Sequence, residues 1–221
     1  GVAAYDTFDE AVALANDTRY GLQAAVFTKD IGTALAAADR IDFGGVLITP
    51  ITTMLAEIAA WHDVAMLTML DVLMGPREVS TPDHPWHRCE RGEIPIAAMQ
   101  ADVTPFAAAA GIDLRGDEYA HLLRGEFDVH ADVVDRIGKL RADGYPVGLL
   151  TNSFVEFRPI IEARVDIDLF DVVVDSSEVG HRKPEPAIYA LTTERMGVAP
   201  EQIVYLDDFA ANVSGARAAG W

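Results

Sequence analysis

Hydrophobic and polar positions beyond residue 130 fall into two alternating patterns. Short apolar runs that end in polar residues have the length of buried strands, whereas apolar residues three and four positions apart indicate helices. We expect strands at 145–153, 169–176 and 202–208, and helices at 132–144, 184–197 and from 212 onward. Gly144 is placed to end the first of these helices. Strands that alternate with helices predict an α/β fold with a parallel sheet.

The preceding residues, 52–128, carry a helical pattern that is broken by turns. Helical apolar spacing runs through residues 52–75 and stops at Gly75–Pro76, a pair that ends helices. Residues 77–93 are expected to form a loop, and two or three short helices follow. Residues 1–41 predict a separate short α/β unit with the order helix, strand, helix.

Composition limits the possible partners. The chain has 221 residues and a net charge of −18, from 35 acidic and 17 basic residues. Such a surface repels nucleic acid and anionic membranes, so we expect neither as a partner. No apolar run reaches the about 18 residues that span a bilayer. With Cys89 as the single cysteine, no internal disulfide forms, which favours a cytoplasmic protein. The sequence does not define an oligomeric state.

Polar side chains gather at the expected strand ends, where parallel α/β sheets carry their chemistry. They are Asp42, Thr151, Asn152, Asp207 and Asp208. Carboxylates brought together repel one another unless a cation intervenes, and Mg²⁺ is the hard ion that prefers oxygen ligands. Lys183 is one of only three lysines and lies in a loop stiffened by Pro and Gly. Each feature alone is more often a turn or a helix cap, but together they predict phosphoryl transfer.

Four segments from about residue 42 to 221 resemble the haloacid dehalogenase (HAD) superfamily. They are DFGGVL, GLLTNS, GHRKPEPAIY and VYLDDFAANVSGARAAG, and PWHRCERGEI resembles the family's cap segment. The resemblance is strongest to the subgroup similar to the amino-terminal phosphatase domain of soluble epoxide hydrolase. It implies a three-layer, Rossmann-like parallel sheet formed by residues 42–51 and 129–221. A helical cap, residues 52–128, is inserted into that sheet domain.

The resemblance also implies an activity, which is Mg²⁺-dependent hydrolysis of a small phosphate ester through an aspartyl-phosphate. Carried over position by position, it assigns a nucleophile, a metal site and a phosphate site. The nucleophile is Asp42; the Mg²⁺ ligands are Asp42, the Gly44 carbonyl and Asp208, with Asp207 as a ligand or as support; Thr151, Asn152 and Lys183 bind the phosphoryl group.

Three departures from the family pattern leave other functions open. Gly44 stands where most family phosphatases have a second Asp that acts as general acid and base. The strand before Asp42 carries Asp39 and Arg40 where apolar residues are expected, and the family's next strand and helix are expected to begin at Trp221. An inactive protein that keeps the fold is therefore one alternative. Carbon–halogen hydrolysis, which needs no metal, is another, although the paired acids Asp207 and Asp208 disfavour it.

Residues 1 to about 48 resemble a late segment of aldehyde dehydrogenases, through YGLQAAVFT and the following GGVLI. None of that family's catalytic residues is expected in such a segment, and Cys89 lies in the wrong region, so aldehyde oxidation is the least favoured function. The stretch DFGGVLI fits the end of one family and the start of the other. We therefore predict an in-frame join of two unrelated sequences near residue 42.

Overall fold

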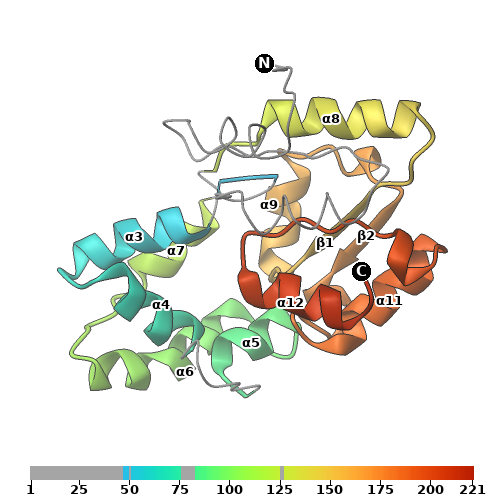
Figure 1. Cartoon of the computed structure of the whole chain (residues 1–221). Helices are drawn as coiled ribbons and strands as arrows, with labels where there is room; N and C mark the ends of the chain where they lie inside the picture. Colours follow the sequence, from blue (N-terminus) through green and yellow to red (C-terminus); the bar gives the residue numbers. More distant parts are fainter. Residues whose placement is uncertain (1–46, 50, 76–82, 125–126) are drawn as a thin grey trace, which may run out of the picture.

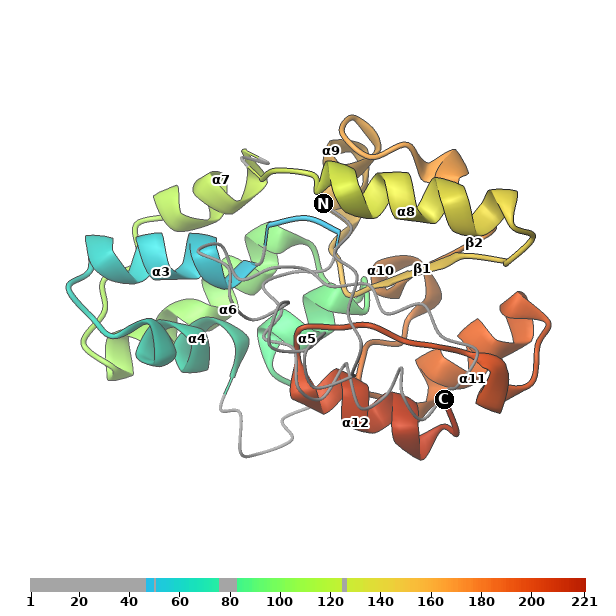
Figure 2. The same cartoon turned by 45° about the horizontal axis from the view of Figure 1, so that its top comes forward.

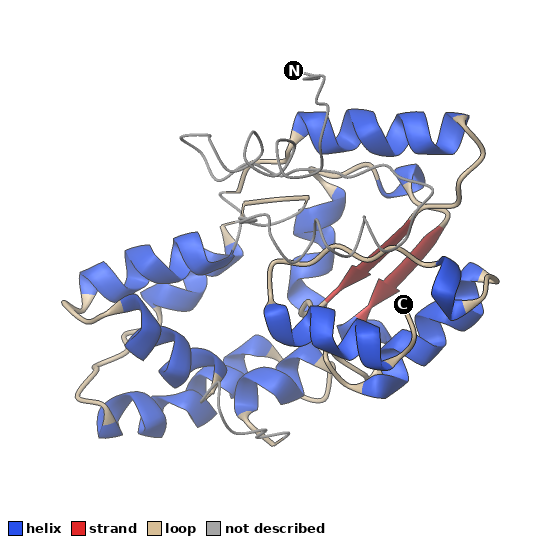
Figure 3. Cartoon of the chain, viewed as in Figure 1, coloured by secondary structure: helices blue, strands red, loops and turns tan. Residues whose placement is uncertain are grey.

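The computed structural model describes residues 47–49, 51–75, 83–124 and 127–221. This part of the chain is an α/β structure in which helices surround two parallel strands (Figures 1 and 3). In chain order the elements are α3 (Ile51–Trp61), α4 (Met66–Met74), α5 (Pro85–Glu90), α6 (Ile96–Ala109), α7 (Asp117–Leu123), α8 (Ala131–Ala142), β1 (Gly148–Thr151), α9 (Arg158–Glu162), β2 (Val172–Asp175), α10 (Ser176–Val179), α11 (Pro186–Met196) and α12 (Ala210–Ala218). Short 3₁₀ turns, η1 to η3, lie at Val155–Phe157, Ile167–Leu169 and Pro200–Gln202.

The strands β1 and β2 form the centre of a three-layer arrangement. They pair in parallel, in a register that sets Thr151 opposite Asp175 at their carboxyl ends. Successive side chains of a strand point to opposite faces. Leu149 and Val173 accordingly pack in the apolar cluster that includes α8, and Leu150 and Val174 pack in the cluster that includes α11 and α12. Figure 1 shows α8 on one side of the strands and α11 and α12 on the other.

The third predicted strand, residues 202–208, is wrong for this structure. Its residues 203–207 have no regular secondary structure. A segment is a strand only when its backbone pairs with a neighbour, and within the described residues the sheet contains β1 and β2 alone. Apolar residues predict an extended, half-buried segment here, but they do not specify a pairing partner.

The segment before α3 is joined to the sheet side of the molecule by an isolated antiparallel bridge between Ile48 and Val129. The bridge includes a hydrogen bond from the Thr49 amide to the Asp128 carbonyl, at 3.0 Å, and one from the His130 amide to the Leu47 carbonyl, also at 3.0 Å. It brings the chain on either side of the helices α3 to α7 back together.

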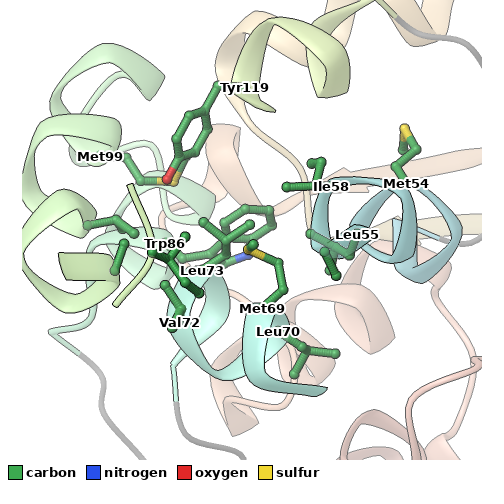
Figure 4. Packing of buried hydrophobic residues seen from close by; sticks show 14 of the residues in the cluster. Met54, Leu55, Ile58, Met69, Leu70, Val72, Leu73, Trp86, Met99 and Tyr119 are labelled. Atoms are coloured by element: carbon green, nitrogen blue, oxygen red, sulfur yellow. The ribbon is translucent and has the colours of Figure 1, made fainter. Parts of the chain in front are cut away.

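The helices α3 to α7, which we call the helical region, have an apolar core of their own (Figures 1 and 4). Large side chains from four of its helices are almost fully buried there, namely Leu55, Ile58, Met69, Leu73, Trp86, Met99 and Val103. The predicted helices broken by turns are therefore seen in the described part of residues 52–128. Among the described helices, none combines the length and the apolar character that a membrane span requires.

The helical pattern predicted over residues 52–75 is interrupted in the structure. Helix α3 ends at Trp61, and Asp63 has a left-handed backbone with φ of 53°. The Asp63 amide donates to the Ala60 carbonyl at 3.3 Å, and the Val64 amide donates to the Ala59 carbonyl at 3.1 Å. This is the Schellman pattern that normally has glycine at the position of Asp63. Apolar spacing continues across the break, which is why the sequence pattern did not reveal it.

The predicted loop at residues 77–93 contains α5. Pro85 is the first residue of this helix, where its missing amide proton costs nothing, and the His84 imidazole accepts a hydrogen bond from the Trp86 amide at 3.3 Å. Histidine is an uncommon cap, so the helix start was not recognised in the sequence. Helix ends elsewhere agree with prediction: Gly144, with φ of 86°, follows α8, and Pro186 begins α11.

We predict that Asp63→Gly stabilises the protein. Glycine adopts a left-handed backbone without the steric cost that a β-carbon brings, which is about 1 kcal/mol. The melting temperature should rise by about 2–4 °C for a chain of this size. Asp63→Ala, which keeps the β-carbon, is the matched control and should bring no gain. Equal melting temperatures for the two variants would contradict this account of the break.

Candidate active site

The candidate site lies at the carboxyl end of β1. Thr151 is the last residue of this strand, Lys183 lies in the loop between α10 and α11, and Asp207 and Asp208 lie just before α12. Hydrogen bonds and an ion pair link four of the predicted residues, directly or through neighbouring backbone atoms: Thr151, Asn152, Lys183 and Asp207. The predicted nucleophile Asp42 and the predicted ligand Gly44 lie outside the described residues.

A buried ion pair between Lys183 and Asp207 is the centre of the site. The Lys183 Nζ lies 2.6 Å from Asp207 Oδ2, and the two side chains are only 9% and 6% exposed. The ammonium also donates to the Leu150 carbonyl, in β1, at 3.1 Å. The lysine thus connects the end of the strand to the turn before α12.

Asp207 accepts hydrogen bonds at both carboxylate oxygens. Besides Lys183, Oδ2 accepts from the Tyr205 hydroxyl at 2.5 Å, and Oδ1 accepts from the Phe209 amide and the Asn212 side chain, each at 2.8 Å. Burial works to raise the pKa of Asp207, but the Lys183 charge and these hydrogen bonds outweigh it and hold the pKa below its usual value. Burial and the adjacent carboxylate raise the pKa of Tyr205, so its hydroxyl stays protonated and donates.

Asn152 fixes the backbone of the lysine. Its side-chain amide donates to the Lys183 carbonyl at 3.0 Å, and its side-chain oxygen accepts from the Lys183 amide at 2.8 Å. A two-way bond of this kind sets both the position and the orientation of the loop. Neighbouring Thr151 is half-buried, and its hydroxyl contacts the Asn152 carbonyl at 3.3 Å.

Sequence reasoning missed the supporting residues Tyr205, Asn212 and Asp175. Asn212 lies in the first turn of α12, five residues after Asp207, and that spacing was the available signal. Asp175 ends β2 with 1% of its surface exposed, and it caps α10 by accepting from the Ser177 amide at 2.9 Å. Burial raises the pKa of Asp175 above its usual value. Its place directly after the apolar residues 172–174 was the available signal.

The two adjacent acids have different environments, and this bears on metal binding. Asp207 is engaged by four donors, which suits a supporting residue, whereas Asp208 is exposed. Within the described residues, no group of three or more His, Cys, Asp or Glu side chains is arranged to hold a metal. An exposed carboxylate is a suitable oxygen ligand for Mg²⁺, but the site would also need the predicted ligands outside the described residues.

The buried lysine–aspartate pair thus lies at the carboxyl end of β1, in a fold of parallel strands between helices. Residues 41–220 match the haloacid dehalogenase-like hydrolase family, and the chain belongs to this family. Residues 1–61 match the aldehyde dehydrogenase family. Both predicted resemblances are therefore confirmed.

Phosphoglycolate phosphatases are among the curated relatives. That of Escherichia coli (strain K12) is 34% identical over 121 residues, which cover 49% of this chain and 48% of the relative. That of Salmonella typhi is 31% identical over 121 residues, with the same coverage of 49% and 48%. The chain thus spans about half the length of the curated relatives that it matches.

Solved structures share the fold. One is a HAD family enzyme from Bacteroides thetaiotaomicron in complex with magnesium and inorganic phosphate, with a TM-score of 0.53, 22% identity, and coverage of 80% of this chain and 87% of that chain. Another is a dehalogenase, with a TM-score of 0.58, 18% identity, and coverage of 81% and 79%. At such identities the likeness establishes the fold alone, and it confirms the predicted fold class.

We predict that Asp207→Asn strongly destabilises the protein while Asp208→Asn does not. All partners of the Asp207 carboxylate are hydrogen-bond donors, so the amide NH₂ group of an asparagine would face another donor. The Lys183 charge would also stay buried without its counter-ion, which costs about 3–5 kcal/mol. Replacing exposed Asp208 should change the unfolding free energy by less than about 0.5 kcal/mol. Urea unfolding of the two variants at pH 7 provides the measurement. Similar losses in both would show that the pair is not a structural centre.

The stabilisation by Asp207 should depend on pH. Its pKa is lower in the folded chain than in the unfolded chain, so its contribution is complete above the unfolded value of about 3.9 and is lost as the pH falls through the folded value. The difference in unfolding free energy between the wild type and Asp207→Asn should therefore be constant from pH 7 to about pH 5 and shrink below about pH 4. A difference that grows on acidification would reverse the assigned sign.

Proposed function

We propose that this chain is a Mg²⁺-dependent phosphatase that hydrolyses a small phosphate ester through an aspartyl-phosphate. The observation that carries the proposal is the buried Lys183–Asp207 pair, which holds an ammonium group at the end of β1. A fixed cation at this edge of the sheet stabilises the charge of a transferring phosphoryl group. The phosphatases among its curated relatives support the same substrate class, and the single cysteine, Cys89, fits action in a reducing cytoplasm.

In the proposed reaction, an Asp42 carboxylate oxygen attacks phosphorus and the ester oxygen leaves. Water then attacks the acyl phosphate and releases inorganic phosphate. Lys183 and the Thr151 hydroxyl stabilise the phosphoryl oxygens, and Asn152 holds the lysine backbone in place. Mg²⁺ would be held by Asp42, the Gly44 carbonyl and Asp208, and it would neutralise phosphate charge.

Asp207 acts in this proposal as a support rather than as a metal ligand. Its oxygens already accept from Lys183, Tyr205, Phe209 and Asn212. A ligand role would require breaking bonds that keep the lysine in place. We propose further that the helical region covers the site as a cap and excludes water.

Gly44 restricts the proposed chemistry to substrates with good leaving groups. Glycine has no side chain to protonate the departing ester oxygen, and a positioned general acid contributes about 10²–10⁴-fold to such a step. An aryl phosphate, whose leaving group is stable as an anion, needs no such proton. We therefore expect faster hydrolysis of aryl phosphates than of alkyl phosphates.

The first test is hydrolysis of an aryl phosphate with and without Mg²⁺. We expect metal-dependent turnover that falls at least about a hundredfold in Asp42→Asn, because the nucleophile is lost. Asp135→Asn, at an exposed position of α8, is the matched control and should retain activity. Folded protein without turnover would favour an inactive member of the family. Release of halide from a haloacid in the presence of a chelator would favour dehalogenation.

A second test addresses Gly44 directly. Gly44→Asp should raise turnover of an alkyl phosphate by about a hundredfold, the lower end of what a general acid contributes, and should change aryl phosphate turnover much less. Gly138→Asp is the control, because it adds a carboxylate where a new β-carbon would meet no atoms within 4 Å beyond its chain neighbours and the backbone of its own helix. An equal effect on both substrates would contradict the proposed role of this position.

A further inference from the structure

Helix α5 and the two residues after it, residues 85–92, contact both loops that carry the candidate site. We call these residues the α5 segment. In Figures 1 and 2, α5 lies on the side of the helical region that is nearest to the sheet. Its contacts with the sheet side are two ion pairs to the loop of Lys183, an aromatic contact to Phe154, and close backbone packing against α10. The α5 segment therefore connects the helical region to the chemistry.

The first contact is a buried ion pair between Glu90 and Arg182. The Glu90 carboxylate accepts a hydrogen bond from the Arg182 Nε, and the side chains are 6% and 14% exposed. Arg182 directly precedes Lys183 in the chain. Breaking a buried pair by removing one partner leaves an uncompensated charge. Loss of Glu90 would leave two neighbouring cations, Arg182 and Lys183, with one fewer carboxylate between the helical region and the loop.

A second ion pair holds the other end of the same loop. Arg91 Nη1 lies 3.1 Å from Glu185 Oε1, and the Arg91 side chain is only 10% exposed. The other oxygen of Glu185 accepts from the Arg182 amide at 3.1 Å. Residues 182–185 are thus fixed from the α5 segment at both ends, with Lys183 between the two attachment points.

Gly92 allows the backbone of the α5 segment to approach the backbone of α10 at Ser177. It has φ of 69°, and a β-carbon at this position would lie 2.2 Å from the Ser177 carbonyl oxygen. Such a distance is not tolerated against backbone atoms, so only glycine fits here. The α5 segment is therefore packed tightly against α10, which leads into the lysine loop.

The loop after β1 is attached to the same segment. Phe154, two residues after Asn152, is buried in the apolar core of the helical region. Its ring packs edge-to-face on Trp86 of α5, with 4.9 Å between ring centroids. Aromatic pairs of this geometry stabilise beyond simple burial. The residues that follow Thr151 and Asn152 are thus part of the core of the helical region.

We propose that the α5 segment positions both phosphate-binding loops, with Glu90 acting through Arg182 as a positioning residue for Lys183. This inference rests on the proposed phosphatase function for its effect on phosphate binding, but its structural part can be tested separately. It assigns a second role to the helical region: besides covering the site, it sets the geometry of the residues that bind phosphate.

The test uses Glu90→Gln in the whole chain, with Glu57→Gln as the matched control. Glu57 is also a carboxylate of the helical region in contact with a basic side chain, His121, but it is 55% exposed and lies on α3 rather than in the α5 segment. Hydrogen exchange of the peptide containing residues 182–185 should become faster in Glu90→Gln and stay unchanged in Glu57→Gln. Calorimetry with inorganic phosphate in the presence of Mg²⁺ should show about tenfold weaker binding for Glu90→Gln, as is typical when an outer-shell partner is lost.

The outcomes separate the two proposals. Unchanged exchange and unchanged phosphate affinity in folded Glu90→Gln would overturn the inference and leave the phosphatase proposal standing. Faster exchange in a protein whose wild type binds no phosphate would support the structural coupling and contradict the proposed function. If Glu90→Gln does not fold, Arg182→Lys serves instead, because it keeps the charge but loses the guanidinium geometry. It should show the same changes to a smaller degree, and their absence would overturn the inference.

Discussion

The buried pair of Lys183 and Asp207 is the interaction on which the rest of the site depends. A charge removed from water is costly unless partners compensate it, and each member of this pair has several partners. Lys183 is held by Asp207 and the Leu150 carbonyl, and Asp207 is held by Tyr205 and Asn212 in addition. These bonds connect β1, the lysine loop and the start of α12. The position of the ammonium group is therefore set by the fold, before any substrate binds.

The same need for compensation extends to the helical region. Arg182, next to Lys183, is paired with Glu90 of α5, and Phe154 inserts into the apolar core there. Coverage of the candidate site alone would not require the helical region to share its core with the residues that follow β1. Because it does, displacement of α5 would expose Phe154 and Trp86 to water and separate buried charges. The helical region and the site are energetically one unit around α5.

Much of the fold could be predicted because its signals are local. Gly144 and Pro186 mark helix ends by their backbone preferences, and the strands β1 and β2 are continuous apolar runs. The errors arose where apolar patterning does not determine the backbone, at a segment without a strand partner and at a helix end. Residues 203–207 have strand-like composition but no pairing partner among the described residues, and Asp63 ends α3 in a conformation usually given to glycine.

The candidate site shows the same division. Lys183, Thr151 and the two acids were identified because polar residues at the ends of apolar strands are readily recognised in sequence. Their separate roles were not identified, because Asp207 and Asp208 are the same type of residue and differ only in their burial and their hydrogen-bond partners. The link from Glu90 to Arg182 spans 92 positions, and a single sequence contains no signal for such a pairing.

The two family matches overlap at residues 41–61, and the structure shows where residues 51–61 of this overlap pack. Residues 51–61 form α3, whose Leu55 and Ile58 have no exposed surface and pack in the core of the helical region. A segment that buries these side chains against α4 contributes apolar burial to the hydrolase part of the chain. Whatever its resemblance to aldehyde dehydrogenases, α3 therefore stabilises the region to which the lysine loop is attached.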